Sequence, residues 1–261
     1  MEGRRLAGVT VRHGDLRRPL PDGFAERLEG RSVVRIGRRA KYLLLELDDG
    51  GVLLIHLGMS GHVLIDPAGA AERTPGKHEH VVFEVDNGTR ICYSDPRRFG
   101  LMDLIDGGAM DEYPLLAHLG PEPTGDDFTG PVLAARLKGR HSPIKAALLD
   151  QRLVAGLGNI YVCESLFRAG ISPRRSAHTV QGGRADRLAA AIRDVLAAAI
   201  KAGGSTLRDH VAPSGEIGYF QHSFKVYGCE GAPCPTKGCG AAIGRLVQSG
   251  RSTFFCSRCQ C

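Results

Sequence analysis

Apolar and β-branched residues in the first hundred positions form short runs separated by Gly, Asp and Asn, a pattern typical of β-strands joined by turns. One of these turns contains Asn87-Gly88, a dipeptide that readily accepts positive φ. We therefore predict an N-terminal β-sandwich or barrel over residues 1–107. Its clearest strand pairs are Tyr42–Leu47 with Val52–Leu57, and Val81–Val85 with Arg90–Ser94.

The pattern changes after this region. Three prolines, Pro114, Pro121 and Pro123, predict a connection over residues 108–126, because proline continues neither a helix nor a central strand. Apolar residues then recur at helical spacing, and Gly203-Gly204 is placed to end the longest helix. We predict a helical domain over 127–222 and a small module over 223–261. The periodic core positions of the long helix are Leu188, Ile192, Val195, Leu196 and Ile200.

Two of the predicted helices, Ile144–Asp150 and Ile160–Ala169, are joined by a segment too long for a tight helical hairpin. Its glycines allow backbone N–H groups to approach a phosphate at the start of the second helix, where the helix dipole also favours an anion. Asn159 lies at this point, and it is equally suited to be an ordinary N-cap.

The chain has 261 residues, with 34 basic against 28 acidic side chains and a pI near 9.0, which favours a polyanionic partner only weakly. The distribution of the cations favours it more, because closely spaced arginines are suited to neutralising phosphates along a duplex, although a scattered, solvated surface remains the alternative. The arginine pairs are Arg17/Arg18, Arg38/Arg39, Arg97/Arg98 and Arg174/Arg175, with Arg140 and Lys145 between the last two.

The sequence has no apolar run long enough to span a membrane and no secretory signal at its start, so we expect a cytoplasmic protein. Cysteines stay reduced in that compartment. The clustering of the eight cysteines toward the C-terminus therefore predicts a metal site instead of disulfides.

The spacing Cys234-x4-Cys239 and Cys256-x2-Cys259 places two cysteine pairs on facing turns, from which four thiolates can surround zinc. Cys229 and Cys261 are possible competitors for these positions. Four cysteines leave no place for an activated water, so the metal is expected to be structural. Between the pairs, Arg245–Gln248 and Thr253–Phe255 are predicted to form a hairpin with Ser249-Gly250-Arg251 at its tip, which would aim Arg251 outward.

Five motifs follow one another along the chain: Arg38-Arg39-Ala40-Lys41-Tyr42-Leu43, His56-Leu57-Gly58-Met59-Ser60-Gly61, Lys77-His78-Glu79-His80, Asp95-Pro96-Arg97-Arg98-Phe99-Gly100 and Gly156-Leu157-Gly158-Asn159-Ile160-Tyr161. The zinc ribbon, with Arg251 before its second cysteine pair, comes after them. These six features, in this order, make the chain resemble the bacterial formamidopyrimidine-DNA glycosylases along nearly its whole length.

The resemblance implies an α+β protein in which a β-sandwich is joined to a helix-two-turn-helix domain and a zinc finger, with DNA in the cleft between them. It implies a base-excision repair enzyme that removes oxidised purines from duplex DNA by base flipping and Schiff-base chemistry and then cleaves the strand. The partner is damaged double-stranded DNA, the cofactor is one structural zinc ion, and the protein is expected to be a monomer.

The resemblance also assigns roles to residues, each with a plainer alternative. Lys41 and Arg251 match catalytic positions, although Lys41 by itself is an ordinary strand-end lysine. Met59, Arg97 and Phe99 match the residues that fill the gap left by the flipped nucleotide, although a lone Met or Phe is more often buried in a core. The remaining matches are to DNA-contacting positions (His78, Arg140, Lys145, Asn159 and Tyr161), an acid near the active site (Glu164, alternatively a helix-stabilising carboxylate) and a loop over the flipped base (Pro213–Phe220, alternatively a plain surface loop).

The start of the chain departs from the family pattern, in which an N-terminal Pro attacks the sugar and a Glu follows it. Here the chain begins Met1-Glu2-Gly3, which aligns beyond the first helix of the family, so the Met1 amine is not expected to replace that nucleophile. Two explanations stay open. Either the start codon is assigned too far downstream, which the intact remaining motifs favour, or the product is a DNA binder that lacks base excision.

Three other activities are alternatives to a purine-specific glycosylase. A non-catalytic damaged-DNA or abasic-site binder would use the same helical domain and zinc ribbon, and an endonuclease VIII-like glycosylase for oxidised pyrimidines would share the scaffold. A zinc-dependent nucleobase deaminase would need an open metal site and an H-x-E signature, and His78-Glu79-His80 does not have that spacing.

Overall fold

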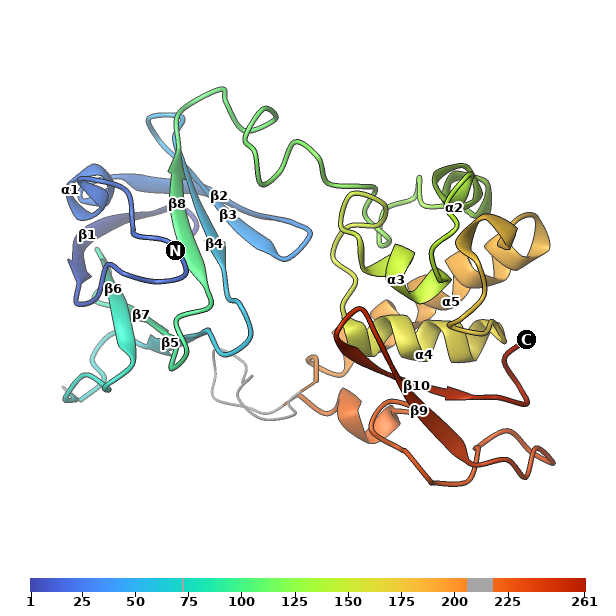
Figure 1. The fold of residues 1–261 in the computed structure, drawn as a ribbon. Coiled ribbons are helices and arrows are strands. Elements are labelled where there is room, and N and C mark those ends of the chain that lie inside the picture. Colours follow the sequence, from blue (N-terminus) through green and yellow to red (C-terminus); the bar gives the residue numbers. More distant parts are fainter. Residues whose placement is uncertain (72, 206–217) are drawn as a thin grey trace. The chain divides into compact units, whose positions relative to one another are not determined.

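The structure, a computed structural model, describes residues 1–71, 73–205 and 218–261. The chain divides into two compact units, which are described separately (Figure 1). The first is built on Met1–Ala117, and the second combines His118–Gly204 with Tyr219–Cys261. Strands dominate the first unit and helices the second, which confirms the predicted α+β class.

Eight antiparallel strands form the first unit, in the order β5-β7-β6-β1-β2-β3-β4-β8. One short helix, α1 (Phe24–Leu28), lies between the first two strands of the chain. Both predicted hairpins are confirmed, with strand ends within two residues of the expected positions. The strands are β1 (Arg4–Val11), β2 (Ser32–Arg39), β3 (Tyr42–Leu47), β4 (Val52–His56), β5 (His62–Asp66), β6 (Glu79–Val85), β7 (Arg90–Ser94) and β8 (Leu101–Ile105).

Strand β1 divides the sheet into the two layers of a sandwich. Its first residues, Arg4 and Arg5, pair with β2, whereas the segment from Leu6 to Val11 pairs with β6, and the register shifts between Leu6 and Gly8. Such an irregularity bends a strand and lets it pass from one layer to the other. Side chains from both layers, including Leu6, Leu53 and Phe83, then meet in one core. Among the described strands the order stays open at β5 and β8, so the unit is a sandwich and not a closed barrel.

The turn between β2 and β3 consists of two residues, Ala40 and Lys41, because Arg39 and Tyr42 already pair. Ala40 has a φ of 52°, a left-handed conformation that L-residues other than Gly, Asn and Asp rarely adopt. The surrounding contacts therefore hold a strained backbone next to Lys41, and strain of this kind concentrates at functional positions.

Helices form most of the second unit, around a core that includes Leu133, Leu166 and Leu188. The predicted periodicity of α5 is confirmed for Leu188 and Ile192, which are fully buried, but Ile200 is 69% exposed and is not a core residue. The elements are α2 (Gly130–Leu137), α3 (Ile144–Leu149), α4 (Asn159–Ala169), η1 (Ala177–Thr179), α5 (Gly183–Lys201), η2 (Phe220–Ser223), β9 (Ile243–Gln248) and β10 (Arg251–Cys256).

The second unit begins at His118, earlier than the boundary expected at residue 127. The intervening segment is not a free linker, because the Gly120 N–H donates to the Gln151 carbonyl and Arg193 donates to the carbonyls of Gly125 and Asp126. The C-terminal module also belongs to this unit. Its strand β10 packs on α4, and Cys163 of α4 shares a cluster with the zinc-spaced cysteines.

Candidate nucleic-acid interface and metal centre

The four cysteines predicted as zinc ligands come together. One ligand atom from each lies within 4.8 Å of all the others. The Sγ···Sγ separations are 3.8 Å for Cys234–Cys259, 3.6 Å for Cys239–Cys256 and 3.3 Å for Cys239–Cys259. Four thiolates at the usual Zn–S length of about 2.3 Å in a tetrahedron lie about 3.8 Å apart, so the set fits one zinc ion.

Neither competing cysteine joins this cluster. The thiol of Cys229 donates to the Tyr227 carbonyl, and Cys261 is exposed. Burial opposes ionisation of Cys234, but hydrogen bonds from Thr236, Cys256 and Cys239 together lower the pKa of that thiol to about 7, which favours the thiolate that a metal needs. Four sulfur ligands complete the shell, and the site therefore suits a structural zinc ion.

The hairpin of the metal module places Arg251 differently from the sequence prediction. The turn contains only Ser249 and Gly250, with φ values of 49° and 70°, as a two-residue type I′ turn requires. Arg251 is the first residue of β10, where it pairs with Gln248 and is exposed. It therefore projects from a regular strand beside the tip, on a support fixed by the cysteines below.

Asn159 is not an N-cap. The N-cap of α4 is Gly158, and no side chain caps this helix. The Asn159 side-chain amide instead donates to the Ser252 carbonyl at 3.0 Å and to the Tyr227 hydroxyl at 3.4 Å. It thereby joins the start of α4 to β10, next to Arg251. Tyr227 was missed in the sequence, where no spacing relates it to Asn159.

Lys145 lies beneath the surface of the second unit. Its residue is fully buried, and its ammonium has no hydrogen-bond partner among the described residues. Burial lowers the pKa of Lys145; Cys163 opposes this effect in part, and the positive charge of Arg251 lowers the pKa further. An unpaired buried ammonium is costly, because burial removes its water without supplying a partner.

Glu164 has a structural role that neither sequence interpretation anticipated. Its carboxylate is 4% exposed and accepts hydrogen bonds from the backbone N–H groups of Lys225, Val226 and Tyr227 at 2.8–3.1 Å. This ties α4 to the segment that leads into the metal module. These donors engage both carboxylate oxygens, so Glu164 holds two segments together that lie far apart in the sequence.

Two other predicted DNA contacts are engaged within the unit. The Arg140 guanidinium forms an ion pair with Asp150 at 3.5 Å, and the Tyr161 ring packs against Phe220 with centroids 5.9 Å apart. The predicted loop Pro213–Phe220 falls largely on residues 206–217, outside the described residues. Of that loop the structure describes only the end, Gly218–Phe220.

In the first unit, Met59 and Phe99 lie at the surface. Met59 is 69% exposed and Phe99 is 46% exposed, so the interpretation of either as a core residue is wrong. The Arg97 guanidinium stacks over the Phe99 ring at 5.2 Å from its centroid. An exposed thioether and an exposed ring with a stacked cation form a surface suited to entering a base stack.

Lys41 lies at the rim of a hollow of about 310 Å³. The hollow is enclosed by the β2–β3 turn and the loop that carries Met59, so it brings two of the predicted motifs together. Its lining residues are Arg38, Lys41, Tyr42, Leu43, His56, Leu57, Gly58, Met59 and Gly61.

His56 at the end of β4 supports this loop. Its Nδ1 accepts a hydrogen bond from the Gly58 N–H at 3.0 Å, which requires that nitrogen to be unprotonated. Burial and the positive charges of Lys41 and Arg17 lower the pKa of His56 below its usual value. The neutral imidazole is therefore the form that holds the Met59 loop.

This arrangement predicts a pH-dependent stability. Below pH 6.5 His56 is protonated in the unfolded chain, whereas its lowered pKa keeps it neutral in the folded chain. The stabilisation that the neutral His56 provides is therefore fully present above pH 6.5 and is lost as the pH falls through the folded pKa. We expect wild type to lose up to about 1 kcal/mol more than His56→Asn between pH 7.5 and 5, the scale of one hydrogen bond. Urea unfolding at both pH values measures this, since Asn keeps the acceptor without titrating. Equal losses in both proteins would contradict it.

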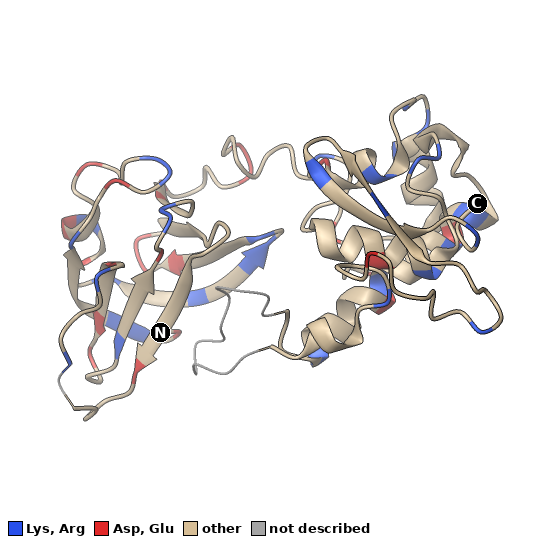
Figure 2. Cartoon of the chain, turned by 60° about the horizontal axis from the view of Figure 1, so that its bottom comes forward, with Lys and Arg blue, Asp and Glu red and all other residues tan. Residues whose placement is uncertain are grey.

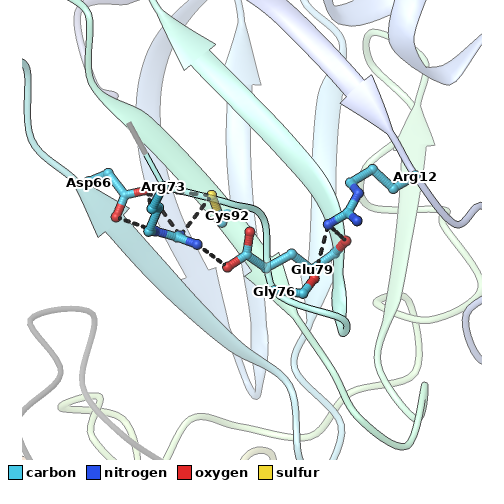
Figure 3. A network of polar contacts seen from close by, with 6 residues as sticks. All are labelled: Arg12, Asp66, Arg73, Gly76, Glu79 and Cys92. Carbon is cyan, nitrogen blue, oxygen red and sulfur yellow. Dashed lines mark hydrogen bonds and ion pairs between the residues drawn. The ribbon is translucent and has the colours of Figure 1, made fainter. Parts of the chain in front are cut away.

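The predicted DNA contact His78 directly precedes β6, and Glu79, the first residue of that strand, belongs to a polar network (Figure 3). Arg73 binds Asp66 through Nε at 3.0 Å and the buried Glu79 through Nη1 at 2.6 Å. From the other side, Arg12 donates to the carbonyls of Gly76 and Glu79. The network therefore anchors the segment that carries His78 at the start of the strand.

Charge does not by itself delimit a binding surface. Figure 2 shows Lys and Arg on the strands of the first unit and on both the helices and the hairpin of the second. The contacts of individual side chains define the candidate sites better than the distribution of charge does. Within the described ranges, no helix combines the length and the apolar character that crossing a membrane requires.

The order of these sites along the chain agrees with comparisons to known proteins. Three family models match: the formamidopyrimidine-DNA glycosylase N-terminal domain at residues 1–102, the H2TH domain of the same enzymes at 119–211, and a zinc finger found in FPG and IleRS at 231–260. Formamidopyrimidine-DNA glycosylases of Paracoccus denitrificans and Cereibacter sphaeroides are 57% and 56% identical to the chain, over 100% of it and 94% of each relative.

Solved structures agree as well. The chain is similar to the MutM (Fpg) protein from Thermus thermophilus, with a TM-score of 0.86, 40% identity and coverage of 100% of this chain and 92% of that one. It is also similar to Lactococcus lactis Fpg in complex with DNA containing an abasic site, with a TM-score of 0.88, 34% identity and coverage of 100% and 93%.

Proposed function

The chain belongs to the formamidopyrimidine-DNA glycosylase family, and from this premise we propose that it removes oxidised purines from duplex DNA and cleaves the strand at the resulting abasic site. The reaction requires a flipped nucleotide, because the glycosidic bond is not accessible inside the base stack. Residues that fill the stack and residues that hold the backbone are therefore both needed.

The observation that carries this proposal is the exposure of Met59 and Phe99 in the first unit, with Arg97 stacked on the Phe99 ring. A protein that only neutralises phosphates has no need of exposed apolar side chains on rigid loops. Flipping costs a few kcal/mol per unstacked step, and apolar wedges offset part of it by occupying the gap. We assign Met59, Arg97 and Phe99 to this role, with Lys41 of the neighbouring hollow assisting the chemistry.

The second unit supports the proposal through a polar group suited to a phosphate. Asn159, Tyr227 and Arg251 lie around the join of α4 and β10, and Lys145 is within electrostatic reach of Arg251. Amide, hydroxyl and cationic donors of this kind position a backbone without reading its sequence. We assign these residues to the phosphates around the lesion, and His78 and Arg140 to flanking phosphates. The zinc ion holds the hairpin that carries Arg251.

Borohydride trapping of the native gene product, purified from its own chromosomal expression, tests the reaction. On a duplex with oxidised guanine, the proposal expects base release and a covalent protein–DNA adduct, because borohydride reduces a Schiff base between an amine and the sugar. A duplex with an oxidised pyrimidine gives the matched comparison. Specific binding with neither base release nor adduct would identify a damaged-DNA binder, and faster release of the pyrimidine would identify endonuclease VIII-like specificity.

Lys145→Met separates a phosphate role from a structural one. The substitution removes an unpaired buried ammonium, so we expect the free protein to become more stable, by about 1–3 kcal/mol. We expect binding to abasic-site DNA to weaken, and the slope of log K against log salt to fall by about 1. Urea unfolding and fluorescence anisotropy measure the two effects.

Lys138→Met is the control, because Lys138 is an exposed lysine of the same unit. It is expected to change neither stability nor affinity appreciably. If Lys145→Met instead destabilised the protein and left the salt slope unchanged, the ammonium would be a structural group and the phosphate assignment would be wrong. We further propose that the protein acts as a monomer in the bacterial cytosol and nucleoid, where its DNA substrate is found.

A further inference from the structure

Asp95, which directly follows β7, is a fully buried carboxylate that receives hydrogen bonds from three different segments. One oxygen accepts from the Ser60 hydroxyl at 2.5 Å. The other accepts from the Tyr93 hydroxyl at 3.1 Å and from the Gly100 N–H at 2.7 Å. Ser60 follows Met59 directly, and Gly100 follows Phe99, so this single side chain is bonded to the neighbours of both exposed apolar residues.

The backbone of Asp95 extends the connection. Its carbonyl accepts from Arg98 N–H at 3.2 Å and lies 2.8 Å from His80 Nε2, and its N–H donates to the His78 carbonyl at 3.0 Å. Arg98 itself has a φ of 53°, a conformation that a non-glycine residue keeps only when its surroundings hold it. The loop from Arg97 to Phe99 is therefore held in a strained shape by contacts to Asp95.

Close packing leaves the two loops no room to move separately. A Cβ on Gly58, beside Met59, would lie 2.5 Å from the carbonyl carbon of Phe99, and one on Gly100 would lie 1.8 Å from the Tyr93 hydroxyl. Real Cβ atoms do not approach other atoms so closely, so glycine is required at both positions. The Met59 loop and the Arg97–Phe99 loop thus touch backbone to backbone around the buried carboxylate.

We propose that Asp95 is the positioning residue that joins the Met59 loop and the Arg97–Phe99 loop into one preorganised insertion unit. This inference rests on the proposed function, in which these side chains enter the base stack. Inserting two separately mobile loops would require their ordering at the moment of flipping, whereas loops fixed in advance avoid that entropy loss. Asp95 touches no DNA in this role and acts through the residues it holds.

Asp95→Asn tests the inference, because Asn keeps the shape and one acceptor but presents an amide NH₂ to groups that are themselves donors. The readout is the stopped-flow fluorescence of 2-aminopurine placed beside a stable abasic-site analogue in a duplex, which reports unstacking without any chemistry. We expect Asp95→Asn to slow unstacking by between about tenfold and a hundredfold, the range that small misplacements of positioned groups produce. Circular dichroism confirms that the variant is folded at the temperature used.

Asp103→Asn is the matched control. Asp103 lies on β8 of the same unit and also accepts a hydrogen bond from a tyrosine hydroxyl, that of Tyr113, but it holds neither loop. It is expected to leave unstacking within about twofold of wild type while losing a comparable hydrogen bond. If Asp95→Asn does not fold, Ser60→Ala replaces it, since this removes one donor and keeps the buried carboxylate in place.

A double-variant cycle with Met59→Ala separates positioning from general stability. If Asp95 acts through Met59, the double variant unstacks DNA only slightly more slowly than Met59→Ala alone. If the rate effects of Asp95→Asn and Met59→Ala multiply in the double variant, the inference is overturned and the proposed function stays intact. The same conclusion follows if folded Asp95→Asn and Ser60→Ala unstack DNA at the wild-type rate. Normal unstacking in Met59→Ala itself would instead overturn the assignment of the inserting residue, and with it the premise.

Discussion

Removal of the metal, by Cys256→Ser or by a strong chelator, is expected to unfold the C-terminal module and to abolish measurable specific binding to abasic-site DNA. Structural zinc contributes about 10–16 kcal/mol of apparent binding energy in small zinc modules, more than the remaining packing of such a segment supplies. The four sulfurs lie in one cluster with Val226 and with Cys163 of α4. Loss of the ion therefore also disturbs the Asn159–Ser252 bond that supports Arg251.

Metal content by atomic absorption and affinity by fluorescence anisotropy measure this result, with one zinc per chain expected for wild type and none for Cys256→Ser. Cys261→Ser is the matched control, since Cys261 is exposed and outside the ligand set. It is expected to retain full zinc and affinity. Wild-type affinity in a zinc-free Cys256→Ser protein would show that the module does not support the DNA-contacting residues.

Glu164→Ala is expected to give the second large effect, a loss of about 3–5 kcal/mol in the free energy of unfolding. A buried donor left without a partner costs about 1–3 kcal/mol, and this substitution removes the acceptor of one buried N–H, that of Val226, and of two partly buried ones, those of Lys225 and Tyr227. Glu164→Gln keeps one acceptor oxygen and is expected to lose roughly half as much. Urea unfolding monitored by circular dichroism measures both variants.

Glu230→Ala provides the control for charge alone. Glu230 is exposed and forms a surface ion pair with Arg245 at 3.6 Å, so its removal is expected to change stability by less than about 1 kcal/mol. A Glu164→Ala protein of normal stability that had lost only strand cleavage would restore Glu164 to the role of an active-site acid. The expected pattern is instead a loss of stability, with DNA binding falling as the segment around Tyr227 detaches.

The identity of the metal ligands was readable from the chain because spacing alone limits their geometry. Cysteines with two or four residues between them on tight turns bring both thiols of a pair within reach of one ion. The hairpins of the first unit were equally local, since strand alternation and turn chemistry lie within a dozen residues. The resemblance then supplied roles for Lys41, Met59 and Phe99 through motif order.

The wider contacts required the folded chain, because they join residues with no common local pattern. Glu164 meets the segment 225–227 some sixty positions later, and Asn159 meets Ser252 at an even longer separation. Whether a side chain is covered also depends on everything that packs above it. For that reason Lys145, which was expected among the DNA-contacting residues, is buried, whereas Ile200, which was expected in the core, is exposed.

The sequence by itself therefore determined the α+β class, the hairpins, the zinc ligands and the family resemblance, since each depends on short-range spacing or on motif order. The tertiary structure alone decided which polar groups are enclosed and what they hold. Asp95 illustrates the difference, because its motif marks it only as part of a loop. Its burial among donors from Ser60, Tyr93 and Gly100 makes it the centre around which two exposed apolar residues are fixed. A carboxylate is stable in such a place only when the fold brings its partners to it.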